Sequence, residues 1–101
     1  MSSFCLSQDM DTASEIQELE KQLKETPVEQ KVVIFNLLSE KNLSIDSQRS
    51  KEYADTAYKL ALVLHDSSGM SQALFNLGDA LYYLNDYDAA IKYYKEAKGL
   101  E

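Results

Sequence analysis

Few side chains in this chain could do chemistry, and none of them has the spacing of a known reactive site. The 101 residues include one histidine, His65, and one cysteine, Cys5. Because a zinc site takes several His or Cys ligands, these two distant residues predict no metal site. The glycines Gly69, Gly78 and Gly99 are too scattered for a phosphate-binding loop. We therefore predict no catalytic residue, no metal and no cofactor.

Two other groups of residues suggest structure rather than chemistry. Asp86 and Asp88 flank a predicted turn, where aspartate is favoured as a helix cap. The seven tyrosines invite a stacking or cofactor-binding interpretation, but they recur at helical spacing, so we interpret them as packing residues. His65 stands near the end of a predicted helix, where we expect it to be exposed and to interact with the helix dipole.

Composition and charge narrow the class of partner. Apolar residues make up 45% of the chain and charged residues 27%, while three glycines and one proline leave few breaks, which favours long helices. A net charge of −7 would repel a phosphate backbone and an anionic membrane surface. No apolar run has the length of a transmembrane helix. We therefore predict no nucleic-acid partner and no membrane insertion.

The N-terminal segment, residues 1–11, allows two interpretations. Cys5-Leu6-Ser7 places small residues at the spacing of a signal-peptidase site, but the charged and long apolar regions of a signal peptide are missing. Residues 1–11 are therefore either the remnant of a signal peptide or a disordered N-terminus. The location stays open between the cytoplasm and, if a signal peptide preceded it, the periplasm.

Capping signals predict two helices in the first half of the chain. Thr12 and Glu15 form a capping box, which starts a helix that ends before Pro27. Thr26 and Glu29 form a second box, so we expect Thr26 to cap the next helix, with Pro27 in its first turn. The apolar stripes are Ile16, Leu19 and Leu23 in the first helix, and Val32, Val33, Phe35, Leu37 and Leu38 in the second.

Three more helices follow, joined by short connections that make neighbouring helices antiparallel. They are predicted over residues 48–65, 70–84 and 87–98, with a loop at 66–69 and a turn at Asn85-Asp86. Asp86 is placed to cap the last helix.

The chain also contains an internal repeat. Residues 34–61 align with residues 74–101 without a gap, and seven positions are identical where chance would give about one or two. The identical pairs are Phe35/Phe75, Asn36/Asn76, Leu37/Leu77, Asp46/Asp86, Tyr53/Tyr93, Ala57/Ala97 and Leu60/Leu100. The chain is therefore expected to hold two equivalent helix pairs.

A helix pair of this kind resembles the tetratricopeptide repeat. Leu77-Gly78 match the Leu-Gly pair of the family's first helix, and Ala90, Tyr94 and Ala97 match the Ala, aromatic and Ala positions of its second. Gly78 and Ala90 would mark the crossing of the two helices, where larger side chains would hold them apart. The first copy matches less well, with Leu38 at the glycine position. Its longer second helix resembles repeats of bacterial signalling proteins such as sensor histidine kinases.

The resemblance implies an all-α fold, a short right-handed α-solenoid of antiparallel helix pairs. We predict a capping helix at residues 12–26, a first repeat unit at 27–69 and a second at 70–101. A further unit would normally cover Ile91 and Tyr94 of the last helix. We therefore expect either a fragment of a larger bacterial signalling or adaptor protein, or homo-oligomerisation through this open helix.

In this family the first helix of each unit lines a groove that binds peptides, so the resemblance implies a non-catalytic protein–protein interaction module. Carried over position by position, the groove residues are Phe35, Asn36, Ser39 and Asn42 in the first unit, and Gln72, Phe75, Asn76, Asp79, Tyr82 and Tyr83 in the second. Asn36 and Asn76 have two open interpretations. Their carboxamides either hold a peptide backbone or bond the neighbouring helix and set its packing.

The predicted groove residues also indicate the kind of partner. Relatives that bind the C-terminal carboxylate of heat-shock chaperones use Lys and Arg in the groove, where this chain has Phe35, Ser39, Phe75 and Asp79. We therefore predict no cationic clamp and expect a basic or aromatic-rich protein or peptide segment. The alternative is a structural, self-associating repeat without a groove ligand.

Overall fold

The computed structural model describes the backbone of residues 2–100 and the side chains of residues 11–100. Within this range the chain is all-α, as predicted, and has no strand. The helices are α1 (Ser2–Glu25), α2 (Lys31–Asn42), α3 (Ser47–Leu64), α4 (Ser67–Tyr83) and α5 (Tyr87–Gly99), with a short 3-10 helix, η1 (Val28–Gln30), before α2.

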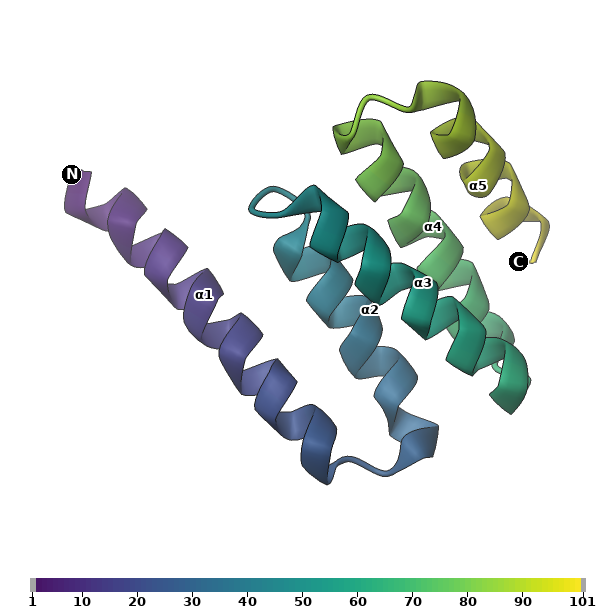
Figure 1. Ribbon diagram of the computed structural model, residues 1–101, viewed down its shortest axis with the longest axis horizontal. Coiled ribbons are helices and arrows are strands. Elements are labelled where there is room, and N and C mark those ends of the chain that lie inside the picture. Colours follow the sequence, from purple (N-terminus) through teal and green to yellow (C-terminus); the bar gives the residue numbers. More distant parts are fainter. Residues whose placement is uncertain (1, 101) are drawn as a thin grey trace.

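Consecutive helices lie antiparallel to one another, as Figure 1 shows. The pairs α2–α3 and α4–α5 form two hairpins, and α3 packs against α4 to join them. α1 runs along α2 and extends well past its C-terminal end, so the two chain ends lie on opposite sides of the molecule (Figure 1). The structure thus has one leading helix followed by two helix pairs, as the repeat predicted.

Aspartate side chains start the last three helices. Asp46, Asp66 and Asp86 each accept a hydrogen bond from the backbone N–H three residues later, which belongs to Arg49, Gly69 and Ala89 respectively, at 3.0, 2.9 and 3.3 Å. The prediction that Asp86 caps the last helix is confirmed. The predicted loop over residues 66–69 is wrong, because the Asp66 carboxylate satisfies the N–H of Gly69 and α4 already begins at Ser67.

The start of the chain differs from the sequence prediction. α1 begins at Ser2, so Thr12 lies inside the helix and the expected capping box does not start it. The helical backbone includes residues 2–11 of the segment that was expected to be disordered or a signal-peptide remnant, and the side chain of Cys5 lies outside the described residues. The origin of that segment stays a prediction.

The junction between α1 and η1 also differs from the prediction. The Thr26 hydroxyl donates a hydrogen bond to the Gln22 carbonyl oxygen at 2.6 Å, so it serves the end of α1 rather than the start of the next helix. Carbonyl groups in the last turn of a helix lack an intrahelical donor, which explains why the hydroxyl turns back. Pro27 takes the N-cap position of η1, without a side-chain capping bond.

Small residues let the helices approach closely. Ala54, Ala97 and two leucines, Leu74 and Leu77, form a buried core between α3, α4 and α5. A Cβ atom added to Gly78 would lie 2.5 Å from Cε1 of Tyr94, so only glycine fits beneath that ring. The crossing predicted at this position is therefore confirmed.

Candidate functional site

The two helix pairs do not match in the register that the sequence repeat indicates. In the first pair the small residue at the helix crossing is Ser39, where the repeat placed Leu38. Ser39 is completely buried, and its hydroxyl donates to the Ser50 carbonyl oxygen at 2.9 Å. The Ser50 hydroxyl returns a bond to the Ser39 carbonyl oxygen at 2.6 Å. Ser50 aligns with Ala90, which is 40 residues later, whereas Ser39 takes the place of Gly78, which is 39 residues later. Relative to the sequence alignment, α2 is therefore shifted by one residue.

The two turns close with different hydrogen bonds, which accompanies this shift. Between α4 and α5, Asn85 has a positive φ of 69°, and the N–H of Asp86 bonds to the Leu81 carbonyl oxygen five residues earlier, at 2.8 Å. Between α2 and α3 no residue has a positive φ, and the N–H of Asp46 bonds to the Asn42 carbonyl oxygen only four residues earlier, at 2.7 Å. The closing carbonyl thus lies one residue nearer to the capping aspartate in the first turn, which offsets α2 by one residue, or about 100°, relative to the aligned letters.

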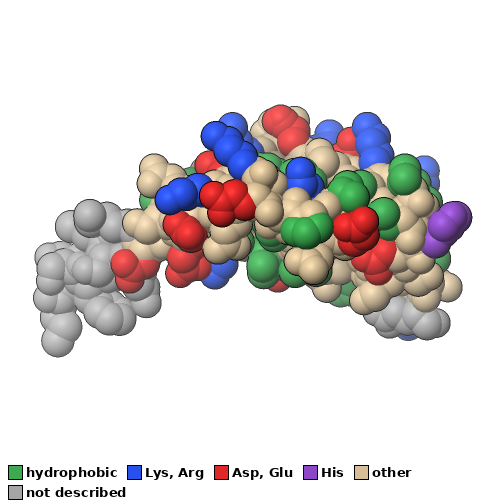
Figure 2. Space-filling view, turned by 90° about the horizontal axis from the view of Figure 1, so that it is seen from below, with side chains coloured by type: hydrophobic (Ala, Val, Ile, Leu, Met, Phe, Trp, Pro, Cys, Tyr) green, Lys and Arg blue, Asp and Glu red, His purple; other side chains and the backbone are tan. Residues whose placement is uncertain are grey.

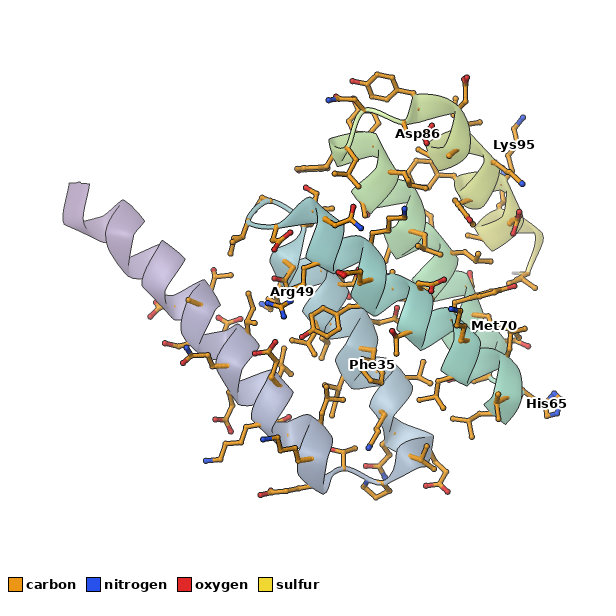
Figure 3. All side chains as sticks on the ribbon, in the orientation of Figure 1. Phe35, Arg49, His65, Met70, Asp86 and Lys95 are labelled. Atoms are coloured by element: carbon orange, nitrogen blue, oxygen red, sulfur yellow. The ribbon has the colours of Figure 1, made fainter. Side chains whose placement is uncertain are left out.

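The predicted groove residues of the first unit are mostly packed between helices in the structure. Asn36, Ser39 and Asn42 are 5%, 0% and 3% exposed, so their side chains are packed between helices, although Asn36 and Ser39 each form part of the lining of a surface hollow. Phe35 is half-buried, with its ring centroid 6.3 Å from that of Tyr53, and Figure 3 shows it where α3 crosses α2. The four residues assigned from the repeat thus belong mainly to the packing between helices.

Other residues of α2 take the exposed face. Val33 is 62% exposed and Leu37 37% exposed, although the sequence assigned both to an apolar core face, and Glu40 is exposed beside them. Val33, Leu37 and Glu40 line an open hollow of about 340 Å³ together with Gln72 of α4. Sequence analysis missed these residues, and the small Ser39 one position beyond Leu38 was the signal that could have revealed the shift.

The two asparagines that the repeat singled out bond to each other. Asn76 is 3% exposed, and its Nδ2 donates to Oδ1 of Asn36 at 3.0 Å. Gln72 Nε2 donates to Oδ1 of Asn76 at 3.1 Å, and Asn36 Nδ2 donates to the Gly69 carbonyl oxygen at 3.4 Å. These carboxamides therefore link α2 with α4. Of the two interpretations that the sequence left open, this is the one in which the asparagines set the packing of neighbouring helices.

In the second unit most of the predicted groove residues of α4 lie at the surface. Gln72 is exposed, Phe75 is 46% exposed, Tyr82 is 56% exposed and Tyr83 is 53% exposed. Asp79 lies between these residues, half-buried, and it is the only charged residue of α4. Buried Asn76 is the exception.

The Tyr94 side chain supports Asp79. Its hydroxyl donates to Oδ1 of Asp79 at 2.5 Å, and its ring centroid lies 5.2 Å from that of Phe75. Burial and then this hydrogen bond to a carboxylate raise the pKa of the Tyr94 phenol. Tyr94 thus holds the carboxylate on the exposed face of α4 in one orientation.

Glu40 of α2 and Asp79 of α4 line the same hollow, of about 210 Å³, together with buried Ser39 and Asn76. Burial raises the pKa of the Glu40 carboxyl, Lys41 opposes this shift, and the charge of Asp79 adds to it. No lysine or arginine lines either hollow between the two helices. We call the following surface residues of these helices, all exposed except half-buried Asp79, the α2–α4 face: Val33, Leu37, Glu40, Gln72, Phe75, Asp79 and Tyr82.

The two residues predicted to form an association surface lie in different surroundings. Ile91 is 52% exposed on α5. Tyr94 is half-buried within its own helix pair, where its ring lies over Gly78 of α4. It therefore packs against α4 and not toward the side of α5 that a further unit would cover. Only Ile91 is therefore an uncovered apolar side chain of the predicted kind.

Other sites that the sequence raised can be placed as well. His65 is exposed, as expected, and ends α3 with a φ of 55°. Figures 2 and 3 show it projecting from one end of the molecule, where no other labelled side chain approaches it. Among side chains 11–100, no three His, Cys, Asp or Glu residues come together in a group that could hold a metal ion. Within residues 2–100, no helix combines the length and the apolar character needed to cross a membrane.

Comparison with known proteins agrees with this geometry. A family model described as tetratricopeptide repeat matches residues 46–99, more than half of the chain, from the Asp46 cap of α3 to the end of α5. No curated protein and no solved structure matches the sequence significantly. The matched range covers the helices that meet at Gly78, Ala90 and Ala97, which are the small positions of the repeat. The chain belongs to the tetratricopeptide-repeat family.

Proposed function

We propose that this protein is a non-catalytic protein–protein interaction module that holds a peptide or protein segment on the α2–α4 face. Membership of a family of interaction repeats supports the general assignment. The location of the binding surface rests on one observation. Val33, Phe75 and Tyr82 are 62%, 46% and 56% exposed, on two adjacent helices whose other faces are packed. Large exposed apolar side chains gathered on one face are typical of interaction sites.

The charge of the α2–α4 face supports a basic or aromatic-rich partner. Glu40 and Asp79 are its charged residues, and the chain as a whole carries −7. A negative surface accelerates encounters with a positively charged segment and disfavours acidic ones. Phe75 and Tyr82 offer rings on which aromatic or cationic side chains can stack.

A peptide library tests this assignment. Random 12-residue peptides displayed on phage are selected on the wild-type protein, and the affinity of selected peptides is measured by fluorescence anisotropy. We expect the double substitution Phe75→Ala with Tyr82→Ala to weaken binding by about tenfold or more, since buried aromatic anchors dominate interface energies. The matched control is Val63→Ala, because Val63 is 73% exposed but lies on α3. Equal binding by all three proteins would contradict the location.

Self-association is a second candidate, which Ile91 favours. This residue is 52% exposed on α5, and Tyr87 and Leu100 at the two ends of that helix are 51% and 42% exposed. Sedimentation velocity over a wide concentration range measures the oligomeric state. If α5 is an association surface, the wild type forms dimers or larger species and Ile91→Glu remains a monomer. A wild type that stays at 11.5 kDa throughout would refute this candidate.

We also propose that the module works within a larger signalling or adaptor protein. α3 has 18 residues and α5 has 13, and a long second helix is the feature that resembles repeats of bacterial sensor proteins. The mass of the native polypeptide, recovered with an antibody to this region, tests the proposal. A mass well above 11.5 kDa would support it, and a mass near that value would contradict it.

A further inference from the structure

We propose that the α2–α4 face recognises an arginine side chain of the bound segment, with the guanidinium between Glu40 and Asp79 and stacked on the aromatic rings of α4. This inference rests on the proposed function, since it names the residue that the same face selects.

The exposed side of α4 alternates between aromatic rings and a carboxylate. Phe75, Asp79 and Tyr82 are separated by four and three residues, so they follow one another along one side of the helix. Phe75 and Tyr82 are 46% and 56% exposed, and Asp79 lies half-buried between them. A carboxylate flanked by two rings can pair with a cation and stack its planar group at the same time.

The second carboxylate comes from the neighbouring helix. Glu40 of α2 lines the same hollow of about 210 Å³ as Asp79 of α4. Their like charges act on one another, which is part of why the pKa of the Glu40 carboxyl is raised. A cation placed in this hollow would replace the repulsion with attraction to both groups. Lys41, the next residue along α2, does not line this hollow, and its Nζ lies 2.6 Å from Oε2 of Glu15 on α1.

The geometry favours arginine over lysine. A guanidinium group is planar, presents five donors that can pair with two carboxylates, and stacks on aromatic faces, whereas an ammonium group is a compact and strongly hydrated charge. Tyr94 holds Oδ1 of Asp79 through a hydrogen bond of 2.5 Å, which orients that carboxylate before a ligand arrives. Acidic and phosphorylated side chains are disfavoured, because two carboxylates and no lysine or arginine line the hollow.

A peptide array tests the inference. Each spot holds 11-residue peptides of degenerate sequence around one fixed central residue, which is Arg, Lys, Leu, Gln or Glu. We expect the wild type to bind the Arg spots about tenfold better than the Leu spots, with Lys between them, because charge-assisted hydrogen bonds are stronger than neutral contacts and a guanidinium can pair with two carboxylates. The difference should shrink at high salt.

Matched variants assign the effect to the two carboxylates. Glu40→Gln and Asp79→Asn should each reduce the preference for Arg severalfold, and together they should abolish it. Glu18→Gln removes the same charge from an exposed position on α1 and should leave the preference intact. Circular dichroism confirms that each variant keeps its helices. The carboxamide introduced by Asp79→Asn can still accept the hydrogen bond from Tyr94, so a packing role alone would not change the preference.

The outcomes separate this inference from the proposed function. An Arg preference that Glu40→Gln and Asp79→Asn remove supports both. Binding that needs Phe75 and Tyr82 but is equal for Arg and Leu spots overturns arginine recognition and leaves the proposed function intact. No binding above background, or binding that no substitution on the α2–α4 face alters, overturns both.

Discussion

The Nδ2 atom of Asn76 donates a hydrogen bond to Oδ1 of Asn36 over 3.0 Å, across the contact between α4 and α2. The two residues are only 3% and 5% exposed, and they come from different helix pairs. A buried carboxamide that loses its partner costs about 1–3 kcal/mol. The pair therefore sets how one repeat unit sits on the next, beyond what apolar packing alone requires.

Replacing Asn76 should destabilise the whole protein. Asn76→Ala removes its bond to Oδ1 of Asn36 and leaves buried polar atoms without a partner, so we expect a loss of about 1–3 kcal/mol in the free energy of unfolding. Urea denaturation followed by circular dichroism measures this loss. Lys92→Ala is the control, because Lys92 is exposed on α5 and lies outside the asparagine pair. Equal midpoints for the two variants would contradict a structural role for the asparagine pair.

Gly78 should not tolerate even a methyl group. In Gly78→Ala the new Cβ would meet the Tyr94 ring at 2.5 Å, and such overpacking costs about 1–3 kcal/mol. Alanine favours the helix by about 1 kcal/mol relative to glycine, which offsets part of this cost. Gly99→Ala makes the same change where no atom lies within 4 Å of the added Cβ, so it should leave stability unchanged or slightly raised. If both variants melt at the same temperature, the close approach of Tyr94 is refuted.

Substitution of Ser39 tests the register of α2. In the structure Ser39 is fully buried against Ser50, so Ser39→Leu should cost about 1–3 kcal/mol or more through overpacking. In the register of the aligned letters the same position would match Asp79, which is half-buried, and leucine would be tolerated better there. Glu40→Leu, one residue further and exposed, should be tolerated. Thermal melts of the two variants decide between the registers, and a tolerated Ser39→Leu would favour the aligned one.

Alkaline pH should weaken the contact between α3 and α1. Burial, followed by the hydrogen bond to Glu20, raises the pKa of Tyr53 from 10.0 to about 12. The fold therefore favours the protonated phenol. Its contribution is complete below pH 10 and is lost as the pH rises from there to about 12. Urea midpoints at several pH values should fall less steeply for Tyr53→Phe than for the wild type.

The control for this titration is Tyr83→Phe, because Tyr83 is 53% exposed on α4. This variant should keep the wild-type dependence on pH. If Tyr53→Phe and Tyr83→Phe behave alike, the hydrogen bond from Tyr53 to Glu20 does not contribute to stability.

α1 should open before the other helices. None of its described side chains, residues 11–25, is buried, whereas α4 has eight buried residues. Its polar links include the exposed pair Glu15–Lys41, and exposed ion pairs contribute about 0–1 kcal/mol. Hydrogen exchange followed by mass spectrometry should show the amides of residues 11–25 exchanging first. Protection of α1 equal to that of α4 would show that the leading helix is an integral part of the core.

The sequence located helices best where a local signal decides the boundary. α3 and α5 were predicted to within one residue, because Asp46 and Asp86 cap them with their own side chains. α4 was placed three residues too late, because Asp66 and the three residues after it resemble a turn but form a capped helical start. The start of α1 was missed, since a capping box at Thr12 also fits inside a continuing helix.

The site was predictable in part for the same kind of reason. On α4 the residues expected at the surface, such as Phe75 and Tyr82, are exposed because the local pattern of the second unit matches the repeat closely. On α2 the letters Phe35-Asn36-Leu37 repeat those of α4, but they are not structurally equivalent. Either Leu38 or Ser39 could have faced Ser50, and the local sequence does not distinguish between them.

The sequence by itself determined the helical class, the two helix pairs and the family, because capping residues, apolar spacing and small crossing residues act locally. Only the tertiary structure decided the register of α2 and which side chains share a surface. The turn before Asp46 closes on a carbonyl four residues back rather than five, which offsets α2 by one residue, about 100° of rotation, and brings Glu40 beside Asp79. The physical reason is that turn closure and packing between helices depend on contacts between residues far apart in the chain.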